Sequence, residues 1–435
     1  MTVTAEYAAK GLPPVPPPTG TAHESASQFL LELARALHVH GTPANRLETA
    51  LKSVAIRLGL EAQFFSTPTS LLVGIGPTVQ QQVHLLRVEP GAPNLGHLSQ
   101  LSTITRDVVD GTADPAEGSR RIATLLGSPQ RWPTPLRLLA YVMSSSAIAC
   151  FLKVNRVDVG IAALLGLVTG LIMLGIARRD SLSHVTEILV AFIVSTIAFT
   201  IDGLTSTQSG YATSLAGLAV LLPGLMLTIA LTELSAQHLS SGTARLMGAI
   251  VIFLALAFGI ALGARFGNAI GNVLSATFPS LDGGSSMAML NVPGTSDLPS
   301  WAEWLALLIA PLAFTVLLNA ESRDAGLIVV ASALSYITAR FAGAAVGEEL
   351  GAFLGALVVS AGSNVSARLL KRSAMVTLTP GLLVLVPGSI GFRGITSMLG
   401  HDIELGVATA FRVALIGISL AAGVLAGNVV TESYE

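Results

Sequence analysis

Four charged side chains fall within or beside long apolar stretches of the sequence: Glu187, Glu233, Glu303 and Arg412. A charge at the centre of a bilayer costs at least about 2.5 kcal/mol, so each of these residues is a candidate for function. The guanidinium of Arg412 could hold a substrate carboxylate through two parallel hydrogen bonds. A structural role is the alternative, with Arg412 as the charge partner of a carboxylate such as Glu233.

Proton coupling is the chemistry that we expect from the carboxylates. Burial raises the pKa of a carboxyl group toward the range in which it can exchange protons in a cell. Glu233 and Glu187 are the candidates, and a solvated position close to the membrane surface is the alternative for both. Glu303 stands between Trp301 and Trp304, an arrangement typical of an interfacial aromatic belt.

Three Pro-Gly pairs interrupt the apolar stretches, at Pro223-Gly224, Pro380-Gly381 and Pro387-Gly388. Proline removes a backbone donor and glycine weakens the helix, so such a break frees backbone amides and carbonyls to contact a substrate. The alternative is a packing kink. Asn364 could also donate a hydrogen bond to the substrate, or it could join two helices, as polar residues often do in membranes.

The composition indicates a membrane protein. Hydrophobic residues make up 51% of the 435 residues and charged residues only 11%, whereas soluble domains carry about 25% charged residues. The net charge of −2 argues against a nucleic-acid partner. The single cysteine, Cys150, excludes an intramolecular disulfide. We expect no metal site and no cofactor, because the sequence has neither metal-ligand spacing nor a nucleotide-binding motif.

From residue 137 onward the chain contains ten apolar segments of about the length that crosses a bilayer, roughly 20 residues. They are residues 137–153, 158–177, 185–202, 211–234, 244–263, 301–319, 324–340, 349–367, 375–395 and 405–429. Nine Lys and Arg residues flank the segments on the N-terminal side of the membrane and five on the other side. This bias predicts that both termini are cytoplasmic. We expect the membrane to be the inner or plasma membrane of a bacterium.

The two halves of the membrane region are related by a fixed offset of 164 residues. This offset places Pro223-Gly224 on Pro387-Gly388, and it also matches three further glycines: Gly242 with Gly406, Gly259 with Gly423 and Gly263 with Gly427. We interpret the match as a duplication, with repeat 1 at residues 137–265, a loop at 266–300 and repeat 2 at 301–429. Because five spans is an odd number, the repeats are expected to be inverted, as in many secondary transporters.

A soluble domain, called the head below, precedes the membrane region. Residues 1–23 form a Pro-rich tail, and residues 24–131 combine helical periodicity with β-favouring runs between residues 61 and 88. This predicts a small α+β cytoplasmic domain attached to an all-α polytopic membrane protein of ten helices. We interpret Arg46 and Glu48 as a pair that docks on the cytoplasmic ends of the spans. A surface ion pair worth ~0 to 1 kcal/mol is the alternative.

Two stretches of the sequence resemble the threonine/serine exporter family. One is residues 221–263, with Pro223-Gly224, Glu233 and Ser241-Gly242-Thr243-Ala244-Arg245, and the other is the head segment 40–48, followed by Thr67-Pro68-Thr69. The resemblance covers most of the chain. It implies a soluble N-terminal domain, ten spans in two halves, and export of amino acids by means of the proton gradient. Two-protein versions of the family are linked to dicarboxylate export, so the resemblance leaves the substrate open.

We therefore expect a secondary active transporter, and not an enzyme, that exports small amino acids such as threonine or serine by alternating access. A dicarboxylate exporter is the first alternative. The second is a membrane-embedded hydrolase that uses the head, although the sequence has no nucleophile-and-base signature. The expected partners are the small-molecule substrate, protons and the lipid bilayer, and a homo-oligomer is left open.

Overall fold

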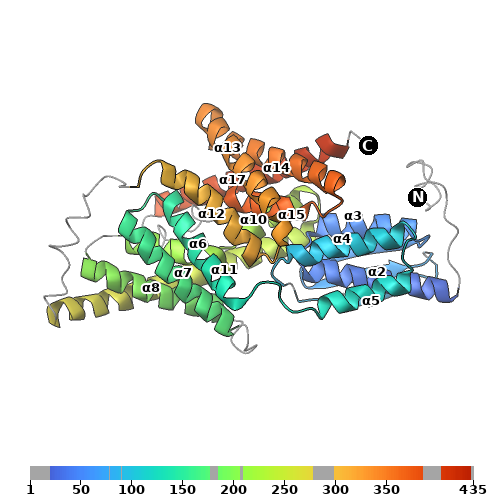
Figure 1. The fold of residues 1–435 in the computed structure, drawn as a ribbon, viewed down its shortest axis with the longest axis horizontal. Coiled ribbons are helices and arrows are strands. Elements are labelled where there is room, and N and C mark those ends of the chain that lie inside the picture. The colour runs from blue at the N-terminus through green and yellow to red at the C-terminus, as the bar shows by residue number, and fades with distance from the viewer. Residues whose placement is uncertain are drawn as a thin grey trace.

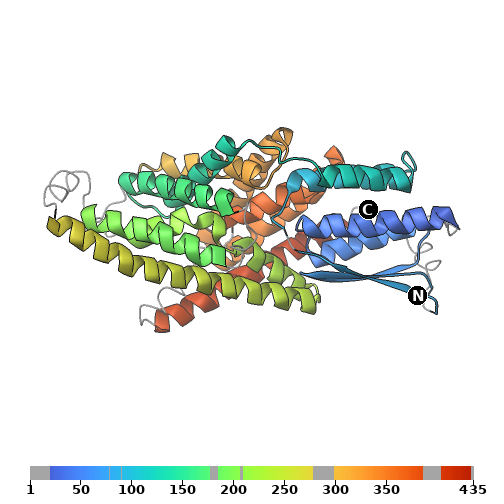
Figure 2. The ribbon, with the colours of Figure 1, turned by 90° about the horizontal axis from the view of Figure 1, so that it is seen from below.

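The molecule is elongated, with the head at one end and the helices from residue 134 onward along the rest (Figure 1). The computed structural model describes residues 20–432 except residues 78, 90, 177–184, 206–208, 278–297 and 386–402. In the view of Figure 2 the helices of the head continue roughly along the direction of the long membrane helices. The head therefore extends the membrane region at one end and does not lie along its side.

The head consists of helices on one face of a three-stranded antiparallel sheet, in the order β1-β2-β3. Its elements are α2 (Thr21–Val39), α3 (Ala44–Arg57), β1 (Ala62–Thr67), β2 (Ser70–Ile75), β3 (Gln82–Arg87), α4 (Leu95–Val109) and α5 (Pro115–Leu126). Alternate residues of β2, namely Leu71, Val73 and Ile75, point into a core that they share with Phe29 and Leu33 of α2. The predicted α+β character of this region is confirmed.

Seven helices in the described part of the chain are long and apolar enough to cross a membrane. They are α6 (Thr134–Phe151), α7 (Arg156–Ile176), α8 (Thr186–Thr205), α11 (Leu239–Thr277), α13 (Ala325–Val346), α14 (Glu348–Leu370) and α17 (Ile403–Glu432). The bent pair α9 (Gly210–Gly217) and α10 (Gly224–Ser235) is an eighth candidate.

Two further apolar helices are shorter, α12 (Trp301–Leu317) and α15 (Met375–Leu385). Each of the ten predicted spans overlaps one of these helices or the bent pair, but the structure supports seven or eight spans. The ninth predicted span is described only as far as Leu385. The number ten therefore stays a prediction.

The Pro-Gly pairs differ in their effect on the helices. Pro223 directly precedes α10, and the chain bends by 58° between α9 and the segment that contains α10. Pro380 lies inside α15 without ending it, so the predicted interruption at Pro380-Gly381 is wrong. A membrane helix tolerates an internal proline where neighbouring helices satisfy the freed backbone groups. The third pair, Pro387-Gly388, lies outside the described residues.

Helix α11 is longer than the fifth predicted span and continues to Thr277. The first part of the predicted loop 266–300 is therefore helical, which corrects that boundary. A row of glycines, spaced four residues apart, lets α11 pack closely on α8. Added Cβ atoms at Gly259, Gly263 and Gly267 would lie 2.6–2.7 Å from backbone carbonyl oxygens of α8.

The two halves repeat this packing. Gly259 and Gly263 of α11 lie against α8, and their counterparts at the 164-residue offset, Gly423 and Gly427 of α17, lie against α14 in the same way. An added Cβ atom would meet Ser195 of α8 at Gly263 and Ser360 of α14 at Gly427. Equivalent contacts at equivalent positions support the duplication. The inverted orientation of the two halves stays a prediction.

The head is attached to the membrane region through the segment that follows α12. The N–H groups of Leu95 and Gly96, at the start of α4, donate to the carbonyls of Leu318 and Asn319 at 2.9 and 3.1 Å. Trp132 Nε1 donates to the Ala320 carbonyl at 3.1 Å. An added Cβ atom at Gly96 would lie 2.6 Å from the Asn319 oxygen, so only glycine allows this approach.

Candidate functional site

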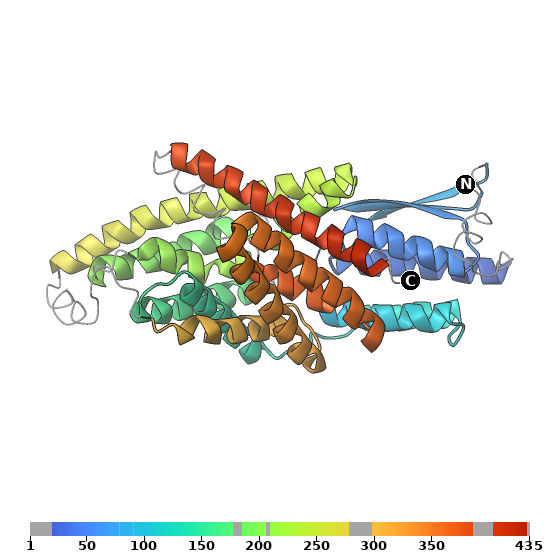
Figure 3. The ribbon, with the colours of Figure 1, turned by 90° about the horizontal axis from the view of Figure 1, so that it is seen from above.

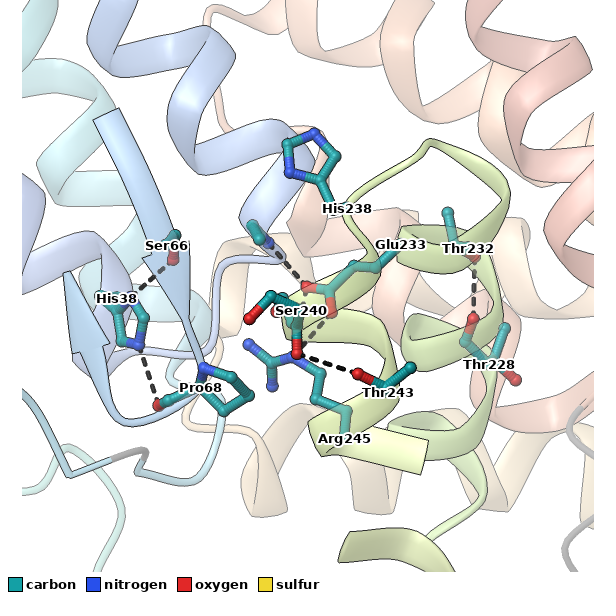
Figure 4. A network of polar contacts seen from close by, with 12 residues as sticks. His38, Ser66, Pro68, Thr228, Thr232, Glu233, His238, Ser240, Thr243 and Arg245 are labelled. Carbon is teal, nitrogen blue, oxygen red and sulfur yellow. Dashed lines mark hydrogen bonds and ion pairs between the residues drawn. The ribbon is translucent and has the colours of Figure 1, made fainter. Parts of the chain in front are cut away.

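Glu233 is a fully buried carboxylate that joins the head to the membrane helices (Figure 4). Its Oε1 accepts the backbone N–H of Ala44 at 2.7 Å, and its Oε2 accepts the Ser241 hydroxyl at 2.8 Å. Arg245 Nε lies 3.2 and 3.1 Å from the same two oxygens. Both oxygens are therefore engaged by donors from two parts of the chain, and Arg245 balances the charge.

The contact with Ala44 explains how α3 begins. Ala44 is the first residue of α3, where a helix leaves its N–H groups without intrahelical partners. The preceding Pro43 provides no side-chain cap. Glu233 supplies the acceptor instead, and a negative charge at a helix N-terminus is electrostatically favourable. A membrane residue thus caps a helix of the head.

The sharp turn between α10 and α11 positions Glu233 opposite Arg245. Glu233 lies in the last turn of α10, and Ser241 and Arg245 lie in the first two turns of α11. Gly242 permits this arrangement, because an added Cβ atom would lie 2.9 Å from both the Ala230 carbonyl and the Leu234 amide. The same turn carries His238, which faces the head.

Glu48 contacts both sides of the junction. Its Oε1 accepts the Ser66 backbone N–H at 2.8 Å and lies 3.7 Å from His238 Nδ1. Burial raises the pKa of the Glu48 carboxyl, while the hydrogen bond from Ser66 and the nearby His238 lower it. Glu48 thus contacts the turn that also carries Glu233, and among the described residues it makes no ion pair with Arg46.

His38 and Ser66 of the head, which lie beside this network, do not form a hydrolytic triad. His38 Nδ1 lies 3.3 Å from Ser66 Oγ, and His38 Nε2 lies 3.0 Å from the Pro68 carbonyl (Figure 4). A backbone carbonyl thus occupies the position where a triad has a carboxylate. Both side chains are buried, and burial lowers the pKa of His38. This geometry does not favour the hydrolase alternative.

A cavity of about 1010 Å³ lies between the head and the ends of the membrane helices that contact it. Helices α3 and α4 form one wall, and α14 and α17 form the other, with α17 ending beside the head (Figure 3). Four arginines line it: Arg46, Arg57, Arg106 and Arg368. None of the described residues that line it is Asp or Glu. The cavity is therefore electropositive and suited to an anion.

Arg46 crosses the cavity from α3 to α17. Its Nη2 donates to Asn428 Oδ1 at 3.1 Å, and the same oxygen accepts from Asn364 Nδ2 at 3.0 Å. Ser360 Oγ lies 3.2 Å from this oxygen and 2.9 Å from the Val424 carbonyl. Asn364 Nδ2 also donates to Thr431 Oγ1 at 2.8 Å. Both donors of Asn364 are thus used inside the protein, which favours its role as a link between helices. Burial lowers the pKa of Arg46, which still stays protonated at neutral pH.

The structure does not bring Arg412 to this site. Arg412 Nη2 lies 2.6 Å from Glu348 Oε2, and both side chains are about half exposed. The pairing of Arg412 with Glu233 is therefore wrong, because Arg245, only twelve residues from Glu233, occupies that carboxylate. Glu303 ion-pairs with Arg340. Glu187 lies in the first turn of α8 and is partly buried. Its role in proton coupling stays a prediction.

Four residues of the site were not among the candidates predicted from the sequence: Ser241, Arg245, Arg368 and Asn428. Arg245 could have been found, because its positive charge follows Glu233 at the start of an apolar segment. Asn428 gave no such signal, since it lies 382 residues from the arginine that it contacts. Of the predicted site residues, the junction brings together Arg46, Glu48, Glu233 and Asn364.

Comparison with known families gives matches along most of the chain. Two family models, both described as threonine/serine exporters, match residues 28–267 and 303–430. The boundary between them falls close to the loop predicted between the two repeats. No solved structure matches the chain.

The chain is also similar to membrane proteins of yeasts. The chain is similar to "Pheromone-regulated membrane protein 10" of Candida albicans strain WO-1, with 28% identity over 84% of the chain and 33% of that protein. The protein of the same name from Eremothecium gossypii is 26% identical over 84% of the chain and 48% of that protein. The chain thus spans between a third and a half of the length of these relatives. The bacterial membrane and the orientation of the chain stay predictions.

Proposed function

Because the chain belongs to the threonine/serine exporter family, we propose that it is a secondary transporter that exports a small carboxylate-bearing solute, threonine or serine in the first place. The observation that carries this proposal is the arginine-lined cavity at the junction of head and membrane helices. A solute that leaves the cytoplasm through the membrane helices would pass this point. Proton coupling through Glu187 or Glu233 belongs to the proposal.

Alternating access requires that the head and the membrane helices change their contacts during the cycle. These contacts could change at the bent α9–α10 segment and at the hydrogen bond between Glu233 and Ala44. The turn that follows Glu233 also lines the cavity, through Ala236 and His238. When this turn moves, the cap of α3 and the wall of the cavity move together. A change in the protonation of Glu233, or in the position of its turn, would then change access to the cavity from the cytoplasm.

Dicarboxylate export is a second candidate that one observation favours. A zwitterionic amino acid needs an acceptor for its ammonium group as well as a donor for its carboxylate. The described lining of the cavity offers four arginines and no Asp or Glu side chain. A solute with two carboxylates would use this charge more fully than threonine or serine.

Counterflow in proteoliposomes tests the proposal. Vesicles loaded with unlabelled threonine, serine or succinate are diluted into the same labelled solute, with and without an imposed pH gradient. We expect label to accumulate for at least one solute and the pH gradient to change the rate. Arg120→Gln serves as the matched control, because Arg120 pairs with Glu117 on the exposed face of α5. Accumulation no greater than in protein-free vesicles for every solute would refute the transporter assignment.

A further inference from the structure

We propose that Arg46, a residue of the soluble head, binds the anionic group of the solute at the cytoplasmic entrance. This inference rests on the proposed transport function and adds to it a specific binding residue outside the membrane helices. The composite site would consist of Arg46 from α3 and the polar ends of α14 and α17.

The first argument is the charge balance of Arg46. A guanidinium has five N–H donors, and the structure gives Arg46 a single hydrogen bond, to the neutral Asn428. No carboxylate among the described residues pairs with it. A partly buried cation without a counter-ion is costly, and an anion that enters the cavity would supply the missing charge.

The second argument is that the surrounding acceptors are already used. Asn428 Oδ1 accepts from Arg46 Nη2 and Asn364 Nδ2, and these two bonds use both of its lone pairs. This oxygen fixes one edge of the guanidinium and has no capacity for a further bond. The remaining N–H groups of Arg46 are therefore free for a ligand, and the guanidinium is held in place before the ligand arrives.

The third argument comes from the other arginines of the cavity. Arg106 donates to the Lys371 carbonyl at 2.5 Å, and Arg368 donates to the Thr431 carbonyl at 2.9 Å. Each of these two side chains is thus already tied to a backbone carbonyl at a helix end. Arg46 and Arg106 both reach from the head to the membrane helices, but Arg46 does so through the side chain of Asn428, which itself lines the cavity, so a solute there could touch both walls.

Titration calorimetry on the full chain in phosphatidylcholine nanodiscs tests this site, with succinate, L-threonine and inorganic phosphate as probes. We expect at least one carboxylate probe to bind the wild type, and we expect Arg46→Gln to weaken this binding about tenfold or more. Arg46→Lys should fall between the two, because lysine keeps the charge but loses the planar fork. Arg120→Gln should bind as the wild type does.

Asn428→Asp is a second variant that does not depend on removing Arg46. It keeps the shape and the acceptor of Asn428 and places a carboxylate 3.1 Å from the guanidinium. An internal counter-ion should then compete with the ligand and weaken probe binding while the protein stays folded, as judged by its melting temperature. Unchanged affinity in both Arg46→Gln and Asn428→Asp would overturn the proposal.

Three further outcomes separate this inference from the proposed function. Transport with an unchanged KM in Arg46→Gln would refute the site and leave the transporter assignment intact. Binding that depends on Arg46, in a protein that transports none of the solutes, would support the site and refute the transporter assignment. Loss of succinate binding in nanodiscs that contain phosphatidylglycerol would assign the cavity to a lipid headgroup and overturn the proposal.

Discussion

Replacing Glu233 by Gln should loosen the head from the membrane helices. The change keeps the side-chain shape, but a neutral amide cannot accept from Ala44, Ser241 and Arg245 together. The Glu233 side chain is fully buried and that of Arg245 is 12% exposed. Breaking a buried pair from one side typically costs about 3–5 kcal/mol, because the other charge is left without compensation.

Hydrogen exchange provides the assay, because the Ala44 amide donates directly to Glu233. If the amide exchanges by local opening, a loss of about 3–5 kcal/mol corresponds to roughly a 100- to 5000-fold faster exchange of peptides that start α3. The double variant Glu233→Gln/Arg245→Gln should recover part of this protection. Glu117→Gln, on the exposed face of α5, should leave exchange in α3 unchanged.

The reasoning is refuted if Glu233→Gln is folded and its α3 peptides exchange at the wild-type rate. It is also refuted if adding Arg245→Gln to Glu233→Gln lowers the protection of α3 further, by as much as the loss of an independent second contact would. In either case the buried contact would carry no energetic coupling between the head and the membrane helices.

Three other perturbations have defined outcomes. Gly96→Ala should weaken the attachment of α4 to the segment after α12, seen as faster exchange at residues 95–98, because a Cβ atom has no room there. Burial and His97 lower the pKa of His40 to about 4. The unfolded chain therefore binds more protons between about pH 6.5 and 4. The melting temperature should fall as the pH drops through this window, and less so in His40→Gln. Arg412→Ala should retain transport, because Arg412 pairs with Glu348 away from the cavity; loss of transport in a folded Arg412→Ala protein would return Arg412 to the substrate site.

Local sequence determined the division of the chain into a charged head and an apolar membrane region. It also determined the break before Gly224, because a proline at that position cannot continue the hydrogen-bond pattern of the preceding helix. The repeat was visible for the same reason: close helix packing requires glycine itself, so Gly259 and Gly263 reappear as Gly423 and Gly427. Features that depend on one residue type at one position can be recognised without coordinates.

Charge partners depended on the tertiary structure. Glu233 had several arginines available along the sequence, and only the turn between α10 and α11 places Arg245, and not Arg412, beside it. The same holds for Arg46 and Asn428, which are 382 residues apart and meet because α17 ends beside α3. An ion pair or hydrogen bond forms wherever the fold brings donor and acceptor within about 3 Å. Sequence separation places no limit on that distance, so only the fold could decide it.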